Sequence, residues 1–296
     1  MTTKFDTIAL MGNLRDPLIA ESAAAVANHL PTLGATVFVD AGAPADALPA
    51  TVSAVAAASL ADSAKLIIAI GGDGAMLHAA REAARAGIPV LGLNRGRLGY
   101  LADMSPSDNF EPLNRVLAGD YVSEQRMMLR AEIISDGKSR DCGLALNDVV
   151  VKRQTTGRML EYHSYVDGRF VNSHGGDGFI VATPTGSTAY ALSVGGPIVA
   201  PDLDVIVLAP ICPHTLSDRP IVIPGECITE VQVGDDRAEV NCDGEVSGII
   251  EAGDTLRVAA AERRVNLIHP AGYDYFEILR SKLHWGRSNR RKSSPD

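Results

Sequence analysis

The 296-residue sequence lacks the signatures of several protein classes. Its four cysteines form no CxxC pair, which argues against a zinc or redox motif, and scattered thiols in so long a chain do not indicate a disulfide framework. No apolar run approaches the roughly 18 residues of a membrane span. Residues 1–6 show no basic segment leading into an apolar one. We therefore expect a cytoplasmic protein with reduced thiols, no signal peptide and no membrane partner.

The sequence also lacks an excess of positive charge, because 27 Lys and Arg stand against 36 Asp and Glu, a formal net charge of −9. A nucleic-acid partner needs a basic face that neutralises phosphates, so none is expected. The basic stretch 287–292 is interpreted as a solvated tail. An anionic small ligand is compatible with this balance, since a few glycine amides and one or two arginines can serve it locally.

An α/β pattern fills the first part of the chain. From residue 7 to about residue 118, short apolar strands alternate with helical patterns, which predicts a Rossmann-like α/β domain with a parallel sheet covered on both faces. The Ala-rich stretch 41–64 is ambiguous, and we interpret it as a helix with a loose loop. The expected strands are 8–11, 37–39, 65–70 and 88–93, and the expected helices are 20–30 and 75–86.

After residue 120 the pattern changes to many short apolar segments separated by turn residues, which predicts an all-β second domain. We expect a helical piece at 187–193 and a final helix at 273–285 that folds back on the first domain. The predicted domains are an α/β domain of residues 1–118 joined by 271–296, and a β-rich domain of residues 119–270. The expected strands are 130–134, 146–152, 162–166, 179–182, 205–208, 221–223, 228–233, 238–242 and 255–258.

The first chemically informative motif is Gly71-Gly72-Asp73-Gly74, between an apolar strand and a helix. Ligands bind at this carboxyl end of parallel strands, where glycines and a helix N-terminus let the main chain approach a phosphate. A central carboxylate suits acceptance of a proton from a hydroxyl, or contact with a metal carried by a polyphosphate. The alternative is a tight turn with Asp73 as a helix cap. The loop 94–100 is expected to lie beside this motif, or else to be a plain glycine-rich connection.

The second motif is the segment 177–193, in which an apolar strand leads into a Thr-Pro-Thr-Gly-Ser-Thr run. Its hydroxyls and amides can hold phosphate or ribose oxygens, and Tyr190 can stack on a base. The alternative is a hydroxyl-capped helix start followed by a core tyrosine. Neither GxxxxGK[ST] nor a GxGxxG after a strand is present, which disfavours a P-loop enzyme and an ordinary nicotinamide dehydrogenase.

Taken in order, these motifs resemble the NAD kinase family over residues 67–285. They are GGDG, Asn94-Arg95-Gly96, Leu146-Asn147-Asp148, DGFIVATPTGSTAYALSVGGPIVAP, Pro213-His214-Thr215-Leu216 and Asn266-Leu267-Ile268-His269-Pro270. GGDG alone is shared with phosphofructokinases and diacylglycerol kinases, whereas TPTGSTAY together with the Asn-acid pair is highly specific. The resemblance implies an N-terminal α/β domain, a C-terminal β-sandwich-like domain, substrate in the cleft between them, and a homo-oligomer (dimer or tetramer).

The resemblance also implies roles, position by position. Asp73 matches the aspartate that activates the 2′-hydroxyl of the adenosine ribose. The other matched positions are expected to bind NAD or nucleotide, and they are Gly71, Gly72, Gly74, His78, Asn94, Asn147, Asp148, Arg158, Asp177, Thr188, Ala189, Tyr190, Ala191, Leu192, Ser193 and Glu245.

The sequence departs from the family pattern at three of its positions. Asp148 stands where relatives commonly have Glu, which keeps the charge and shortens the reach. Gly175 stands where many bacterial relatives have a basic residue, so that contact is missing or is replaced by His174. Glu245 replaces an expected Gln. His78 is either a substrate contact or an ordinary histidine on a helix face.

The expected function is NAD kinase, which transfers the γ-phosphoryl group of ATP to the 2′-hydroxyl of the adenosine ribose of NAD and makes NADP. The divalent ion, expected to be Mg²⁺, arrives with ATP along the GGDG loop, and no residue is assigned as a protein metal ligand. Two alternatives stay open: another GGDG-type kinase acting on a lipid or sugar, and a nucleotide-binding regulator without catalysis. The acidic balance gives little sign of the membrane-facing surface of a lipid kinase, and the intact Asp73 argues mildly against a regulator.

Overall fold

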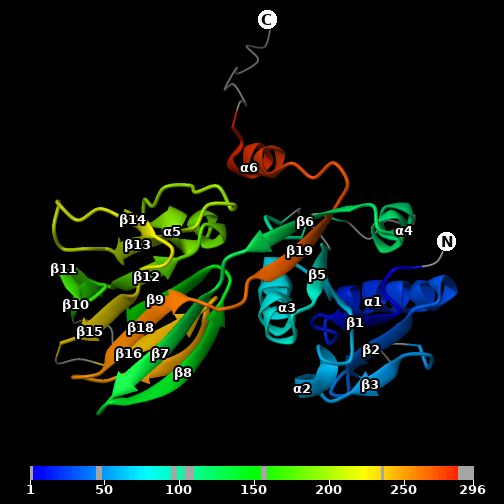
Figure 1. The fold of residues 1–296 in the computed structure, drawn as a ribbon, viewed down its shortest axis with the longest axis horizontal. Helices are drawn as coiled ribbons and strands as arrows, with labels where there is room; N and C mark the ends of the chain where they lie inside the picture. The colour runs from blue at the N-terminus through cyan, green and yellow to red at the C-terminus, as the bar shows by residue number, and fades with distance from the viewer. Residues whose placement is uncertain are drawn as a thin grey trace, which may run out of the picture. The chain divides into compact units, whose positions relative to one another are not determined.

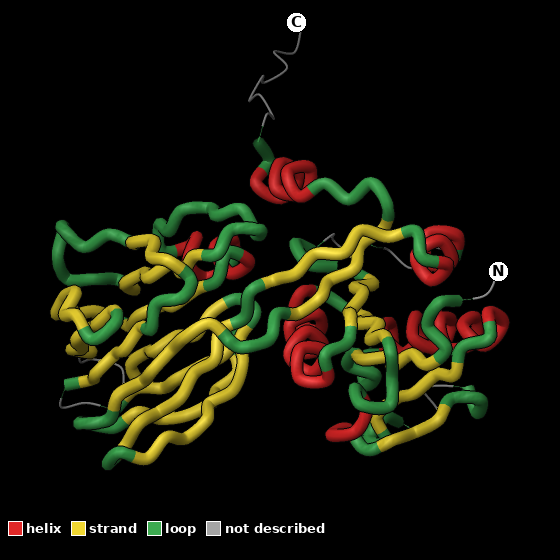
Figure 2. The backbone as a smooth tube through the Cα atoms, in the orientation of Figure 1, coloured by secondary structure: helices red, strands yellow, loops and turns green. Residues whose placement is uncertain are grey.

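The computed structural model describes residues 3–44, 49–94, 99–102, 104, 110–154, 159–234 and 237–285. It consists of two compact units. Unit 1 comprises Met1–Met76, Leu91–Ser123 and Ile268–Asp296, and unit 2 comprises Leu77–Val90 and Glu124–Leu267. Unit 1 mixes helices with strands, whereas strands dominate unit 2 (Figures 1 and 2). The expected fold class, an α/β part followed by a β-rich part, is confirmed.

The first sheet has the strand order β3-β2-β1-β4-β5-β19-β6. The parallel pairings of β1 with β2 and β4, and of β2 with β3, give its N-terminal half the expected parallel character. All five residues of β4 are buried, as in a central strand that is covered on both faces. The strands are β1 (Thr7–Met11), β2 (Thr36–Asp40), β3 (Ser53–Val55), β4 (Leu66–Ile70), β5 (Pro89–Leu93), β6 (Tyr121–Arg126) and β19 (Val265–Pro270).

Six helices in the described part of the chain lie wholly or partly in unit 1. The first begins at Pro17, three residues before the predicted start, because the side chain of Asp16 accepts a hydrogen bond from Leu18 N and Pro17 occupies the first turn. The helices are α1 (Pro17–His29), the 3₁₀ helix η1 (Leu30–Leu33), α2 (Ala57–Leu60), α3 (Asp73–Ala86), α4 (Glu111–Ala118) and α6 (Tyr275–Leu283). The stretch 41–64 needs a correction, since its described residues contain the strand β3 as well as the short helix α2.

Unit 2 contains two antiparallel six-stranded sheets, with the orders β11-β10-β15-β18-β7-β8 and β14-β13-β12-β9-β16-β17. One apolar cluster takes side chains from both sheets, for example Tyr162 and Leu256 from the first and Val181 and Val240 from the second. The two sheets therefore face each other across a shared core.

The interior strands β9, β12 and β13 of the second of these sheets are buried on both faces. Val150, Ile180 and Val207 form another cluster with Ala191, which comes from the short helical segment after β12. The strands are β7 (Leu129–Ser135), β8 (Lys138–Ala145), β9 (Asp148–Arg153), β10 (Leu160–Val166), β11 (Arg169–Gly176), β12 (Gly178–Ala182), β13 (Val205–Ile211), β14 (Ile221–Pro224), β15 (Thr229–Val233), β16 (Ala238–Cys242), β17 (Glu245–Ile250) and β18 (Thr255–Ala260). The helical piece consists of η2 (Thr185–Thr188) and α5 (Tyr190–Ser193).

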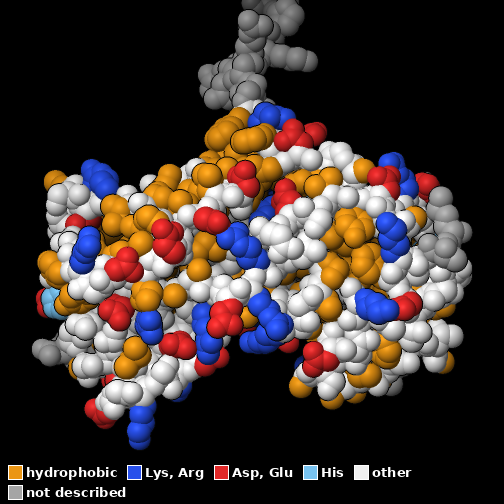
Figure 3. Space-filling view, in the orientation of Figure 1, with side chains coloured by type: hydrophobic (Ala, Val, Ile, Leu, Met, Phe, Trp, Pro, Cys, Tyr) orange, Lys and Arg blue, Asp and Glu red, His pale blue; other side chains and the backbone are white. Residues whose placement is uncertain are grey.

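The structure contains elements that the apolar pattern did not predict. These are β3, β6, β8, β11, β17 and β19 together with helix α4. No helix within the described ranges is long and apolar enough to cross a membrane. On the face seen in Figure 3, basic and acidic side chains are interspersed.

Candidate active site

In unit 1, the GGDG motif forms the predicted turn at the carboxyl end of β4. Gly71 has a φ of 144°, and its N–H donates to Leu93 O on the neighbouring strand at 2.9 Å. A Cβ at Gly72 or Gly74 would meet nothing within 4 Å. Open space beside these two glycines, at the start of α3, is what the close approach of a ligand phosphate requires.

Asp73 is the first residue of α3, and its side chain is partly exposed. Its Oδ2 accepts a hydrogen bond from Tyr100 N and its Oδ1 accepts one from Leu101 N, each at 3.1 Å. Gly99 makes this possible, because a Cβ there would lie 2.0 Å from Asp73 Oδ1. The carboxylate is therefore oriented by main-chain amides of a different loop, which differs from the helix-cap interpretation. Burial, and then the negative charge of Asp73, raise the pKa of the Tyr100 hydroxyl.

The other predicted residues on the first part of the chain have different surroundings. Asn94 is buried, and its N–H donates to Met104 O at 2.6 Å. His78 is exposed on α3. Arg158 lies outside the described residues, as do residues 95–98 of the loop that was expected beside GGDG and the basic tail 287–292.

In unit 2, three segments that are far apart in the sequence meet at one end of the interior strands β9, β12 and β16, and this end of the strands is called the Asp148 edge below. β9 begins at Asp148 beside the end of β12, where Ala182 pairs with Asp148, and beside the end of β16, where Cys242 pairs with Val149. Antiparallel pairing therefore places the residues before β9, after β12 and after β16 together. This edge carries most of the residues that the sequence assigned to NAD.

Asp148 is the most perturbed carboxyl group at this edge. It is 5% exposed. Burial, and then the negative charge of Asp243, raise the pKa of Asp148 to about 7, while a hydrogen bond from Tyr190 N works in the opposite direction. A buried carboxyl group with a pKa near neutrality is typical of functional sites.

The segment after β12 is ordered by its own hydroxyls. Thr183 Oγ1 accepts a hydrogen bond from Gly186 N at 3.1 Å, and Ser187 Oγ donates to Pro184 O at 2.6 Å. Of the predicted contacts, Tyr190 is 44% exposed, whereas Ala191 is fully buried in the core. Tyr190 is therefore accessible to a ligand, and a tyrosine ring is a group that can stack on a base. Thr188, Ala189 and Leu192 are partly buried, and Ser193 is exposed.

Asp177 lies at the opposite end of β12. Its Oδ1 is 3.2 Å from Arg153 Nη2, and both side chains are more than a third exposed. The Asp177 main chain also bonds to the sheet, since its N–H donates to Ile211 O at 2.9 Å and its carbonyl accepts from Arg153 N at 3.0 Å. The carboxylate is accessible, and its cation partner is weakly held.

His174 does not replace the basic residue that is missing at position 175. Its Nδ1 is 2.9 Å from Asp218 Oδ2, its Nε2 is 3.1 Å from Ser164 Oγ, and its ring stacks on Tyr162. Both ring nitrogens are thus occupied inside the protein. A Cβ at Gly175 would lie 2.7 Å from the end of the Met159 side chain.

Two important residues were missed by the sequence analysis. Arg81, on α3, donates to Asp243 Oδ2 at 3.1 Å and to Glu245 Oε1 at 2.5 Å. Arg81 and Asp243 have side chains that are 8% and 0% exposed, whereas that of Glu245 is 65% exposed. The predicted ligand contact Glu245 therefore pairs with a buried arginine. The available signal was an arginine on the otherwise alanine-rich buried face of α3.

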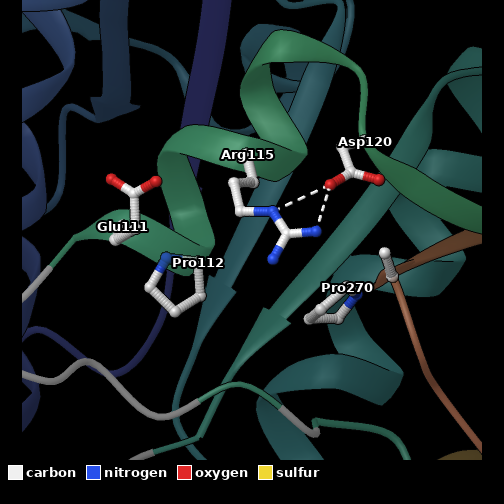
Figure 4. A pocket seen from close by; sticks show the side chains of 6 residues that line it. Glu111, Pro112, Arg115, Asp120 and Pro270 are labelled. Atoms are coloured by element: carbon white, nitrogen blue, oxygen red, sulfur yellow. Dashed lines mark hydrogen bonds and ion pairs between the residues drawn. The ribbon is translucent and has the colours of Figure 1, made fainter.

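A surface cavity of about 360 Å³ in unit 1 is lined by none of the predicted site residues. It is lined by Glu111, Pro112 and Arg115 of α4, by Asp120, and by Pro270 and Ala271 (Figure 4). Arg115 Nε donates to Asp120 Oδ2 at 2.8 Å, so the cavity's cation is already paired. Within the described residues, no three His, Cys, Asp or Glu side chains lie close enough together to hold a metal ion.

Known proteins resemble the whole chain. The family model described as the ATP-NAD kinase N-terminal domain matches residues 20–121, and the one described as the ATP-NAD kinase C-terminal domain matches residues 146–270. The NAD kinase of Nitrosococcus oceani is 43% identical over 97% of this chain and 99% of its own. An NAD kinase structure from Archaeoglobus fulgidus in complex with ATP is 26% identical with a TM-score of 0.73, over 94% of this chain and 98% of its own. A yeast NADH kinase complexed with NADH is 21% identical with a TM-score of 0.88, over 98% and 94% of the two chains, and it shows the common fold.

Proposed function

Because the chain belongs to the ATP-NAD kinase family, we propose that it transfers the γ-phosphoryl group of ATP to the 2′-hydroxyl of the adenosine ribose of NAD. The main support is similarity to proteins named NAD kinase over nearly the full length of the chain. The amide-held carboxylate of Asp73 at the end of β4 is the structural counterpart of that similarity.

In the proposed reaction, the ribose 2′-oxygen attacks the γ-phosphorus of ATP, the bond to the β,γ-bridging oxygen breaks, and ADP leaves. Asp73 accepts the proton that the hydroxyl loses. The two amides that bond to its oxygens hold the carboxylate in place for this step. Phosphoryl transfer depends mainly on positioning and on neutralisation of charge, and a positioned base adds roughly 10²–10⁴-fold.

For NAD binding, we propose Asn147, Asp148 and Asp177 as polar contacts, and the segment 188–193 as the part that wraps the dinucleotide. An ionised Asp148 would accept hydrogen bonds from hydroxyl groups of NAD, and the exposed ring of Tyr190 would stack on a base. His78, Asn94, Arg158 and Glu245 keep their proposed contacts with substrate. The Glu245 carboxylate would then contact the substrate while it also pairs with Arg81.

Three further properties are part of the proposal. ATP enters with Mg²⁺ on its phosphates, so chelation of the ion should abolish turnover and added Mg²⁺ should restore it. All four cysteines are free thiols, which supports a place in the reducing cytoplasm. A homo-oligomer, dimer or tetramer, would cover exposed apolar side chains of unit 2 such as Phe170, and light scattering would measure its mass.

The test of the function is the Asp73→Asn variant. We expect kcat with ATP and NAD to fall by roughly 10²–10⁴-fold while NAD affinity is retained, because the amide cannot accept the proton. Asp62→Asn, which changes an exposed aspartate of the same unit, serves as the matched control and should leave kcat unchanged. Turnover within a few-fold of the wild type in Asp73→Asn would contradict the assigned role.

An acceptor panel tests the substrate class. Wild-type protein with Mg²⁺ and ATP should phosphorylate NAD and should leave a sugar phosphate and a diacylglycerol unchanged. Phosphorylation of either of those acceptors in place of NAD would favour another GGDG-type kinase, and transfer to none of them would favour a regulator.

A further inference from the structure

The main-chain amides of residues 146–148, which carry Asn147 and Asp148, converge on one carboxylate. Leu146 N donates to Asp243 Oδ2 at 2.9 Å. Asn147 N and Asp148 N donate to Asp243 Oδ1 at 2.7 and 3.3 Å. Hydrogen bonds to an ionised acceptor are stronger than those between neutral groups. One side chain therefore orients three consecutive residues.

The carbonyl groups of the same three residues are also bonded. Leu146 O accepts from Thr183 Oγ1 at 2.5 Å, Asn147 O accepts from Thr183 N at 2.9 Å, and Asp148 O accepts from Asp243 N at 2.9 Å. All six main-chain polar groups of residues 146–148 thus have partners, without use of the Asn147 or Asp148 side chains. Those side chains project from a main chain that is already fixed, which is the arrangement that a preorganised binding site needs.

The Arg81 cation offsets the free-energy cost of burying the Asp243 carboxylate. The Asp243 side chain is fully buried, and an unpaired carboxylate in that position would be strongly disfavoured. Arg81 supplies a cation 3.1 Å away, on a side chain that is itself 8% exposed. Its second ion pair, with Glu245, reaches solvent and contributes less.

We propose that Asp243 and Arg81 are positioning residues for NAD, which act by holding Asn147 and Asp148 in the geometry that binds the dinucleotide. They are assigned no contact with substrate. The inference rests on the proposed function, since it assumes that Asn147 and Asp148 bind NAD. Loss of either positioning residue should therefore weaken NAD binding selectively and leave ATP use largely intact.

The charge of Asp243 provides a second readout. Burial raises the pKa of Asp148, and the neighbouring negative charge of Asp243 raises it further. Removal of that charge should lower the pKa of Asp148 and shift the acid limb of kcat/KM for NAD to lower pH. A role limited to stability would not move this limb.

The experiment measures kcat and the KM values for NAD and ATP in Asp243→Asn, Arg81→Met and Arg81→Lys, together with NAD binding by calorimetry. We expect the KM for NAD to rise about tenfold or more in Asp243→Asn and Arg81→Met, with the KM for ATP within about twofold of the wild type. Arg81→Lys, which keeps the cation and loses the planar fork, should lie between them and the wild type.

Matched control variants change the same residue types at other positions, so that an effect specific to Asp243 and Arg81 can be recognised. Arg85→Met changes an exposed arginine one turn further along α3, and Asp254→Asn changes another buried carboxylate of unit 2, which accepts from Glu251 N at 3.0 Å. Neither should change the KM for NAD. If Asp243→Asn does not fold, the Arg81 variants decide by the same comparison.

Each outcome has a defined meaning. A selective rise in the KM for NAD, with the shifted acid limb, supports the inference. Folded variants that bind NAD like the wild type, or that lose kcat only in proportion to the folded fraction, overturn it. Wild-type protein that neither binds nor phosphorylates NAD overturns the proposed function instead, so the two failures are distinguishable.

Discussion

The hairpin turn at Asp243-Gly244 shares its dipeptide and backbone with the turns at Asp136-Gly137 and Asp167-Gly168. In each turn both residues have positive φ, with values of 51° and 81°, 48° and 72°, and 50° and 71°. Each turn joins two antiparallel strands whose flanking residues pair directly, as Cys242 does with Glu245. This is the backbone of the two-residue turn that favours Asp-Gly. The three turns therefore impose the same demand on the main chain.

Their aspartate side chains lie in opposite environments. Asp167 is exposed, and its Oδ1 accepts from Ile228 N, which is the main reason why the pKa of its carboxyl is lowered. The Asp243 side chain is fully buried, and burial raises the pKa of its carboxyl although the amides of Leu146 and Asn147 and the charge of Arg81 act to lower it. The backbone of the turn favours Asp-Gly at all three positions. The surroundings of the aspartate side chain determine its further role, and only Asp243 orients the main chain of residues 146–148.

The largest effect should come from truncation of the two kinds of aspartate. We expect Asp243→Ala to lower the free energy of unfolding by roughly 3–5 kcal/mol, because it leaves the amides of residues 146–148 without their acceptor and leaves the buried Arg81 cation with only the exposed Glu245 as ion-pair partner. Asp136→Ala, at an exposed turn, should cost about 1 kcal/mol or less. Urea unfolding of both variants measures the difference, and equal losses would remove the distinction between the turns.

The next largest effect concerns Asp148, the buried carboxyl group beside Asp243, and is a dependence of stability on pH. The folded-state pKa of Asp148 is about 7, against 3.8 for an unperturbed carboxyl group. Between these two values the folded protein keeps a proton that the unfolded chain has released, so stability falls as pH rises through the window and is constant above it.

Asp148→Asn removes this titration. Relative to the wild type, the variant should gain on the order of 2 kcal/mol of unfolding free energy between pH 5 and pH 8. Urea unfolding at the two pH values is the measurement. A difference between wild type and variant that does not change with pH would mean that Asp148 titrates normally.

A smaller effect, equal at the two kinds of turn, is expected for the glycines. Gly244 and Gly137 both have positive φ, and a Cβ at either would meet nothing within 4 Å. Gly244→Ala and Gly137→Ala should therefore each cost about 1 kcal/mol, from backbone strain alone. Thermal unfolding compares them. A much greater loss at Gly244 would show that the turns differ in backbone as well as in side-chain surroundings.

The smallest effect should come from Asp167→Asn. The pKa of Asp167 is lowered in the folded state, so its carboxylate contributes stability above the unfolded value of 3.8, and that contribution is lost as pH falls through the folded value. The variant should melt slightly below the wild type at pH 7 and together with it once the pH has fallen below the folded-state pKa of Asp167. A larger Tm difference at acid pH would reverse the sign of this argument.

Sequence patterns predicted the strands that are buried on both sides or lie inside a sheet, such as β4, β12 and β9. Most of the strands that were missed are edge strands: β3 and β6 of the seven-stranded sheet, β11 and β8 of one six-stranded sheet, and β17 of the other. An edge strand bonds to one neighbour and exposes more of its surface, so its apolar alternation is weak. β8, for example, begins with four exposed residues.

Of the candidate site, the parts carried by short motifs could be predicted from the sequence, whereas contacts between residues far apart in the sequence could not. Asp73 and the Asn147-Asp148 pair follow from short motifs, and the Asp-Gly turns follow from dipeptides. The bond between Arg81 and Asp243 spans 162 residues and depends on the order of strands in the sheet, which no local pattern contains. The two alternatives for the contact at position 175, missing or replaced by His174, stayed open in the sequence for a related reason, because the partner of His174, Asp218, is 44 residues away.

The fit of Gly186 against Asn147 limits how the Asp148 edge can be re-engineered. A Cβ at position 186 would lie 2.0 Å from Asn147 O, on a carbonyl that already accepts from Thr183 N. A designer who randomises positions 147 and 148 to change acceptor preference should thus keep residues 183 and 186 unchanged, since the two segments pack directly against each other. Variants changed in both segments would mostly lose the local fold of the binding site, and few would have an altered specificity.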